Sequence, residues 1–284
     1  MATFTNQATL TYNGISTLSN IVTGEILEEL DIIKYAVSRT YNGQDLVTYV
    51  ISLRNTGTND YNGITLTDNL GQYQSGAINV TPLDYQANTV NQFVNGVLVA
   101  EPTVTGTNPL TLTGINVPAG GNTTITYSGR PNSFTQLSPT SELTNTVTVS
   151  GGGLAAPISA FDSITPELAP NLNITKSANP TVVPENGTLT YTFVINNTGN
   201  TAATAADNVV VSDVFNPILD ISSVTLNGTP LPATTGYTYD ANTGNFSTVA
   251  GQITVPPATF TQDPATGAIT TTPGQATLVV TGTI

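Results

Sequence analysis

Residues 31–57, DIIKYAVSRTYNGQDLVTYVISLRNTG, align without a gap on residues 173–199, NITKSANPTVVPENGTLTYTFVINNTG. The next apolar segment recurs as well, since residues 64–70, ITLTDNL, match residues 209–215, VVVSDVF. Self-similarity over such a length indicates two copies of one folding unit. A chain of 284 residues is long enough for two such domains, each with its own core.

Within each copy, apolar and polar residues alternate with a period of two, and Gly, Asn, Asp and Pro separate the alternating runs. Thr, Asn, Val and Gly are abundant and no helical pattern of Leu, Glu and Lys occurs, which favours strands and turns. The sequence therefore predicts an all-β fold of two tandem Ig-like Greek-key β-sandwiches with an additional N-terminal donor strand. The expected boundaries are residues 1–20 for the donor strand or extension, 21–158 for the first sandwich, 159–171 for a linker and 172–284 for the second sandwich.

The two ends of the chain carry complementary parts of this repeat. Residues 4–20, FTNQATLTYNGISTLSN, match residues 143–159, LTNTVTVSGGGLAAPIS, which are typical of a closing strand of the first domain. Residues 274–284, GQATLVVTGTI, match residues 121–131, GNTTITYSGRP, the strand before that closing strand. We therefore expect a spare last strand at the N-terminus and a second sandwich that lacks its last strand, as head-to-tail polymerisation requires. The residues assigned to the donor strand are Phe4, Asn6, Ala8, Leu10 and Tyr12.

The composition excludes several classes of function. The chain has no Cys and no His, which excludes disulfides, thiol chemistry and His-based catalysis. Eighteen acidic residues against five basic ones give a net charge of −13, which repels nucleic acid and anionic membranes. The turn at residues 240–244 contains Asp and Asn but is not followed by the Glu ligand of a calcium loop. We expect no enzyme activity toward other molecules, no cofactor, no metal and no nucleic-acid partner.

The sequence contains no visible targeting or membrane segment. The first residues, MATFTNQATL, lack the basic start and the apolar run of a secretory signal. No stretch approaches the roughly 20 consecutive apolar residues of a spanning helix. We therefore expect no membrane insertion.

The second repeat carries a family resemblance. Residues 173–199, followed by VVVSDVF, resemble the conserved-repeat domain of bacterial and archaeal surface proteins, once catalogued as domain of unknown function eleven. The first repeat resembles it more loosely, because the Asn-Pro that usually follows the Lys is replaced by Val37-Ser38. The resemblance implies an Ig-like fold in long surface or appendage proteins and no enzymatic activity. We expect an extracellular location, on a cell or spore surface.

Polar residues in the apolar register of the expected strands are informative, because alternate residues of a strand face the core. Each domain is expected to bury a Lys, an Asp and an Asn. The first trio is Lys34, Asp68 and Asn145, and the second is Lys176, Asp213 and Asn6, with Asn6 supplied by the N-terminal strand of another chain.

These trios predict a covalent crosslink. Burial lowers the pKa of a Lys and raises that of an Asp, so a neutral amine can attack the Asn carboxamide and expel ammonia. The pattern also resembles the self-crosslinking domains of Gram-positive pili and collagen-binding adhesins. Two alternatives remain open: a buried Lys-Asp ion pair without covalent chemistry, and lysines at a strand edge with their ammonium groups in water.

Together these features predict a structural subunit of a bacterial surface or spore appendage fibre. It would polymerise with itself, head to tail, by donor-strand complementation, with an intramolecular crosslink in the first domain and an intermolecular one in the second. The alternative is a two-domain surface adhesin or a binding fragment of a larger repeat protein. In that case, the N-terminal copy would be the tail of an earlier repeat.

Overall fold

The computed structural model describes residues 2–284, and it confirms an all-β fold. Within this range the only helical element is the short 3-10 turn η1 (Ala205–Asp207). The described chain contains no helix with the length and hydrophobicity required to span a bilayer. It divides into two compact units, whose main boundary along the chain falls between Thr165 and Pro166.

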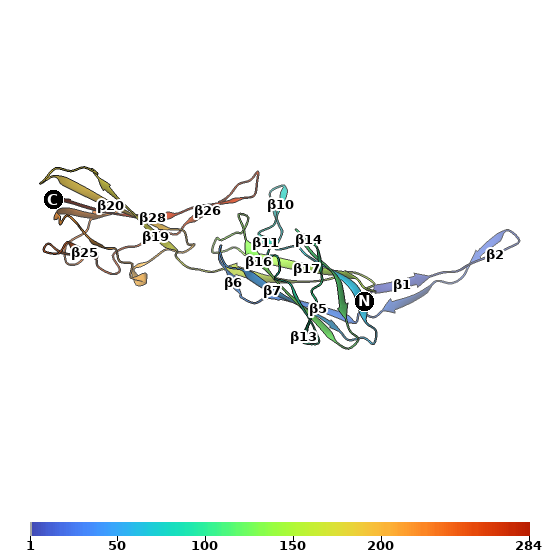
Figure 1. Ribbon diagram of the computed structural model, residues 1–284. Helices are drawn as coiled ribbons and strands as arrows, with labels where there is room; N and C mark the ends of the chain where they lie inside the picture. The colour runs from blue at the N-terminus through green and yellow to red at the C-terminus, as the bar shows by residue number, and fades with distance from the viewer. Residues whose placement is uncertain (1) are drawn as a thin grey trace. The chain divides into compact units, whose positions relative to one another are not determined.

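The first unit contains a β-sandwich, the first sandwich, built from two sheets (Figure 1). One sheet has the order β13-β12-β16-β7-β5, with bounds β5 (Leu30–Ala36), β7 (Val47–Asn55), β12 (Asn91–Val94), β13 (Val97–Val99) and β16 (Asn122–Pro131). The other has the order β14-β15-β8-β17-β18-β6, with bounds β6 (Thr40–Tyr41), β8 (Tyr61–Asp68), β14 (Thr103–Thr107), β15 (Leu110–Val117), β17 (Leu143–Gly151) and β18 (Ile158–Pro166). Three short strands complete the unit: β9 (Tyr73–Ser75) pairs with β10 (Ile78–Val80), and β11 (Leu83–Tyr85) pairs with β16.

The core of the first sandwich follows from the period-two alternation. On β7, Tyr49, Ile51 and Leu53 are fully buried, and the residues between them are less buried. The facing strand β8 buries Ile64 and Leu66 in the same way. Because one face of each sheet is apolar, packing the two faces together removes both from water.

The expected linker at residues 159–171 is partly a strand. Residues of β18 pair antiparallel with β17, from Val149↔Ile158 to Leu143↔Ile164. Within β18, the Asp162 carboxylate accepts a hydrogen bond of 2.7 Å from the Ala36 backbone. The prolines indicated a linker, yet the residues between Pro157 and Pro166 alternate and Ile164 is buried, so this segment extends the sheet. The connection between the sandwiches therefore starts later than expected.

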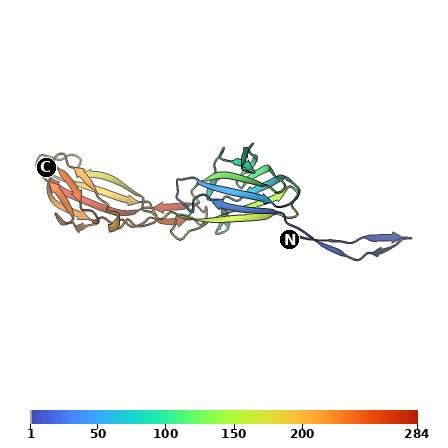
Figure 2. The same cartoon turned by 90° about the horizontal axis from the view of Figure 1, so that it is seen from below.

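The second unit contains the second sandwich. Its larger sheet has the order β19-β20-β28-β22-β23, and its smaller sheet the order β21-β25-β24. This sandwich carries the yellow to red colours of the chain in Figure 2. The bounds are β19 (Leu172–Asn179), β20 (Thr188–Asn197), β21 (Ser212–Val214), β22 (Asp220–Leu226), β23 (Thr229–Pro230), β24 (Tyr237–Asp240), β25 (Asn245–Thr248) and β28 (Gly274–Thr283). A separate hairpin joins β26 (Thr259–Gln262) to β27 (Ile269–Thr272). The apolar core of the second sandwich includes Phe193, Phe215 and Leu278.

The N-terminal segment is a folded hairpin in the structure, not the single strand that the sequence predicts. Its strands are β1 (Ala2–Asn6), β2 (Thr9–Tyr12), β3 (Ile15–Leu18) and β4 (Val22–Ile26), and β1 pairs with β4 while β2 pairs with β3. We call residues 2–26 the N-terminal hairpin. Asn13 and Gly14 connect β2 and β3 with φ values of 45° and 79°, the type I′ conformation that suits a two-residue hairpin.

Candidate functional site

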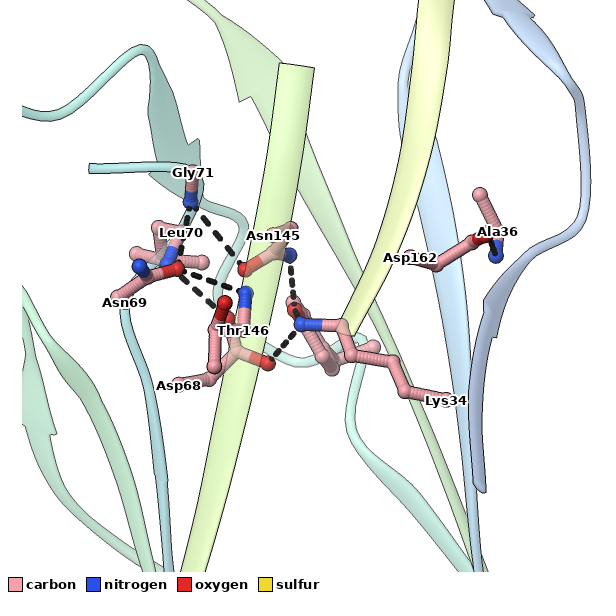
Figure 3. A network of polar contacts seen from close by, with 10 residues as sticks. Lys34, Ala36, Asp68, Asn69, Leu70, Gly71, Asn145, Thr146 and Asp162 are labelled. Atoms are coloured by element: carbon pink, nitrogen blue, oxygen red, sulfur yellow. Dashed lines mark hydrogen bonds and ion pairs between the residues drawn. The ribbon is translucent and has the colours of Figure 1, made fainter. Parts of the chain in front are cut away.

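The first expected trio assembles in the interior of the first sandwich. Lys34 on β5, Asp68 on β8 and Asn145 on β17 point toward one another (Figure 3). The Lys34 Nζ lies 2.5 Å from Asp68 Oδ2, and both side chains have 0% exposure to solvent. Asn145 is fully buried as well. The alternation of each strand therefore places all three residues inward, as the sequence predicts.

A tyrosine that the sequence analysis did not identify joins the trio. The Tyr127 hydroxyl on β16 accepts a hydrogen bond of 2.8 Å from Asn145 Nδ2. It also accepts one of 3.4 Å from Lys34 Nζ. The amine and the carboxamide thus share one partner. Inward alternation on β16 was the available signal, but the contact itself depends on how the two sheets pack.

Burial decides the protonation of the lysine. Removal from water lowers the pKa of Lys34 to about 8, although the neighbouring Asp68 carboxylate opposes this shift. The amine also lies 4.7 Å from the centre of the Tyr49 ring. Burial raises the pKa of Tyr127, so its hydroxyl remains protonated at neutral pH. An appreciable fraction of the lysine is therefore an uncharged amine, the form that can act as a nucleophile.

Backbone groups hold the carboxamide and the carboxylate from the other side. The Gly71 N–H donates a hydrogen bond of 3.2 Å to the Asn145 Oδ1. The Leu70 N–H donates one of 3.0 Å to Asp68 Oδ1. Asn69 secures this turn to β17, because its Oδ1 accepts a hydrogen bond of 2.9 Å from the backbone of Thr146. A donor on the carboxamide oxygen is the arrangement that stabilises the negative charge of an acyl-transfer intermediate.

The two non-covalent alternatives can be compared with this geometry. A lysine at the strand edge with its ammonium in water does not describe Lys34, which is only 4% exposed. A buried ion pair with Asp68 is present in the structure. Such a pair is also the starting arrangement for amide formation, since the Asp can take up a proton as the amine attacks Asn145.

In the second sandwich, Lys176 on β19 and Asp213 on β21 form an ion pair. The ammonium lies 4.2 Å from the centre of the Tyr191 ring. The side chains of the pair are 38% and 19% exposed, so the expected burial of Lys176 is not found in the single chain. Asn6, the third member, lies on β1 opposite Val22, in the first unit.

The exposure of this pair has a structural cause. In the first sandwich, β8 has β15 on one side and β17 on the other. Its counterpart β21 pairs with β25, and within residues 2–284 no strand pairs with its other edge. On and beside β21, Val210 and Val214 are exposed hydrophobic side chains. The second sandwich therefore presents an open edge at the position where β17 closes the first.

The expected donor residues are exposed in the N-terminal hairpin. Leu10 and Tyr12 are 66% and 71% exposed, and Phe4 is about half exposed, at 49%. Asn6 and Ala8 are exposed too. Apolar side chains that are exposed in the described part of the chain are available for contact with another molecule. Within residues 2–284, no group of three or more acidic residues is placed to hold a metal ion.

No protein-family model matches the sequence, and no match was found among curated proteins. Solved structures that resemble it include the pilus backbone RrgB from Streptococcus pneumoniae, at 15% identity and a TM-score of 0.34, over 89% of this chain and 50% of that one. The chain thus spans about half the length of that pilus backbone. BcpA, the major pilin subunit of Bacillus cereus, gives 11% identity and a TM-score of 0.36, over 96% of this chain and 73% of that one. Identities and TM-scores this low carry no argument about function.

Proposed function

We propose that this protein is a structural subunit of a bacterial surface or spore appendage fibre that polymerises head to tail by donor-strand complementation. The observation that carries the proposal is the difference between two equivalent strands. β17 covers one edge of β8, whereas the corresponding edge of β21 is open. An open strand edge with unpaired backbone groups and nearby apolar side chains is a template for an added strand.

The N-terminal hairpin supplies a segment that fits this edge. Residues 4–12 repeat the sequence of β17, so the pairing of β17 with β8 predicts the register of the donor. Val149 lies opposite Leu66, and the corresponding residues are Leu10 and Val211. Leu10 would then point into the core of the second sandwich of a neighbouring subunit, as the fully buried Val149 does in the first.

The same docking would complete the second trio. It would bring Asn6 of one subunit beside Lys176 and Asp213 of the next, in the arrangement of Asn145, Lys34 and Asp68. The amine of Lys176 would attack the Asn6 carboxamide, form an amide bond and release one molecule of ammonia. Because donor and acceptor surfaces differ, the contact need not close into a ring, and the covalent chain would extend along the fibre.

A pair of substitutions on neighbouring residues tests the donor assignment. Leu10→Asp places a charge on the face that would be buried, and Thr11→Asp places the same charge on the opposite face. Both residues are exposed in the free chain, so neither change should unfold the subunit. Electron microscopy and sedimentation of the full-length protein would then measure polymerisation.

We expect Thr11→Asp to polymerise and Leu10→Asp to remain monomeric. Losing the burial of one Leu costs about 2 kcal/mol, and burying an unpaired carboxylate adds several more. A total of at least about 4 kcal/mol weakens association by roughly a thousandfold or more, since each 1.4 kcal/mol is a factor of ten. Equal polymerisation of both variants would contradict the proposal.

A further inference from the structure

The N-terminal hairpin has one apolar and one polar face, and both of its strands contribute to the apolar face. From β1 and β2 this face receives Phe4, Leu10 and Tyr12, and from β3 and β4 it receives Ile15, Val22 and Ile26. All six side chains are exposed. The opposite face consists mainly of Thr and Ser residues, with Glu25 and one exposed apolar residue, Leu18. Because this apolar face spans both arms of the hairpin, a binding surface that buries all of it must contact both arms.

Contacts within the N-terminal hairpin hold its two arms together as a single structural unit. Phe4 and Gly24 lie opposite each other on β1 and β4. A side chain at Gly24 would come within 2.4 Å of the Phe4 ring, so the ring lies directly across the glycine. The Asn13-Gly14 turn fixes the other end, where Leu10 pairs with Thr17. The segment that carries the donor residues is therefore already paired, except at Gln7 and Ala8 between the two strands.

The hairpin also repeats more of the first sandwich than β17 alone. Residues 22–26, VTGEI, match residues 164–168, ITPEL, which begin within β18. β17 and β18 are adjacent antiparallel strands, as are the two arms of the N-terminal hairpin. The N-terminal hairpin thus corresponds to the β17–β18 pair, although its shorter turn gives a different register.

In the first sandwich, β18 covers the region beside β5. It lies between β17 and β6, and the Thr165 N–H donates a hydrogen bond of 3.2 Å to the Arg39 carbonyl. Its Asp162 carboxylate accepts hydrogen bonds from the Ala36 N–H and from Arg39. β18 therefore completes the sandwich on the far side of β17.

The second sandwich shows exposed groups at the corresponding positions. Ile32 on β5 is half-buried, whereas its counterpart Ile174 on β19 is 52% exposed. Tyr41 on β6 is buried, whereas its counterpart Val183 is only half-buried. A single added strand beside β21 would restore the place of β17 and leave the place of β18 empty. On and after β19, Ile174 and Val183 are thus less buried than their counterparts, at the place where a second strand belongs.

We infer that the donor is the whole N-terminal hairpin of a second copy of this chain, with β1–β2 beside β21 and β3–β4 beside the residues that follow β19. This inference rests on the proposed function and specifies what is exchanged between subunits. The docking buries the apolar face of both arms in one step. It also avoids breaking the backbone hydrogen bonds that already join the arms.

Engineered disulfides test the two arms separately, because the chain has no Cys of its own. Thr9→Cys with Ser212→Cys reports the first arm, since Thr148 and Thr67 are paired at the equivalent positions. For the second arm, Thr181→Cys is combined with Thr23→Cys or with Glu25→Cys, which cover the two registers of β4. Every variant carries Lys176→Ala, so that a covalent ladder in a denaturing gel can come from a disulfide alone. Single-cysteine variants are the controls.

We expect a ladder that collapses under reducing agent for the first-arm pair and for at least one second-arm pair. A ladder for the first arm without either second-arm ladder would overturn the hairpin inference and leave the single-strand donor intact. Disulfides formed within monomers, or filaments without any ladder, would overturn the hairpin inference and the proposed function together.

Hydrogen exchange on unmodified filaments gives an independent measurement. Insertion of a single strand requires the hairpin to open, which would release the amides of β3 and β4 and speed their exchange relative to the free chain. Docking of the intact hairpin covers both arms and slows the exchange of the same amides. Faster exchange of residues 15–26 in filaments would therefore overturn the inference even if an engineered variant failed to fold.

Discussion

Amide formation between Lys34 and Asn145 is the sharpest chemical prediction for a single subunit. The reaction joins Lys34 Nζ to the Asn145 side-chain carbonyl carbon and releases the side-chain nitrogen as ammonia, so the intact mass should fall by about 17 Da. Lys34→Ala and Asn145→Ala should both retain the full expected mass. We expect the conversion to follow folding, because only the folded chain brings the two groups together.

The pKa of Lys34 sets the pH dependence of this reaction. With a pKa of about 8, about a tenth of the amine is neutral at pH 7, compared with about 0.03% for an ordinary pKa near 10.5. Burial thus increases the reactive fraction by roughly 300-fold at pH 7. The amine is protonated below its pKa, so the rate should rise about tenfold per pH unit up to about pH 8 and then level off.

Refolding followed by mass spectrometry would measure this rate. Denatured, unreacted protein is diluted into buffers between about pH 6 and 9, and samples are quenched for intact mass analysis. The Lys176→Ala background leaves Lys34 as the only lysine, which removes the second reaction. Full mass at every pH, or a mass loss that persists in Lys34→Ala, would refute the reasoning. A rate that falls as the pH rises would refute the role of the neutral amine.

Three further predictions follow from the two trios and the donor segment. On denaturing gels, Lys176→Ala or Asn6→Ala should convert a detergent-resistant ladder of subunits to monomer. Lys34→Ala should preserve the ladder, but it should lower the melting temperature of the first sandwich, because Asp68 is then buried without its partner. A peptide of residues 2–14 should bind the open edge of β21 and shorten growing filaments in electron micrographs, and the same peptide with Leu10→Asp should leave their length unchanged. In a Lys34→Ala background, which keeps the Asn145 amide, Tyr127→Phe should destabilise the first sandwich by about 1–3 kcal/mol in chemical denaturation, because it removes the acceptor of buried Asn145. Tyr49→Phe should be near neutral, because within residues 2–284 the Tyr49 hydroxyl has no hydrogen-bond partner.

The sequence predicts the inward orientation of Lys34, Asp68 and Asn145 because the face of a strand is fixed by a period of two. It does not predict that Tyr127 connects the amine with the carboxamide, since that contact crosses between sheets. Partners of this kind depend on how far apart the sheets pack and on their relative angle, which a pattern along one strand does not contain.

The N-terminal hairpin was within reach of sequence reasoning. Tyr12-Asn13-Gly14-Ile15 contains an Asn-Gly pair between apolar residues, a strong signal for a two-residue hairpin turn. The match to β17 instead favoured one continuous strand. The sequence does not predict β18 for a related reason, because Pro166 and Pro170 are typical of a linker. In the N-terminal segment, the local turn signal prevails over the alternation of one continuous strand. In β18, the alternation prevails over the prolines.

The contrast between the two trios indicates how docking and crosslinking would be coupled. Lys34 reaches its buried, dry environment when its own chain folds, because β17 of the same chain supplies Asn145 and excludes water. Lys176 is 38% exposed in the single chain, so water solvates its ammonium group. The donor would bring the carboxamide and the dry environment in the same step. In the proposed fibre, an undocked subunit therefore has neither the carboxamide beside Lys176 nor the desolvation that activates the amine, and bond formation is confined to correctly seated neighbours.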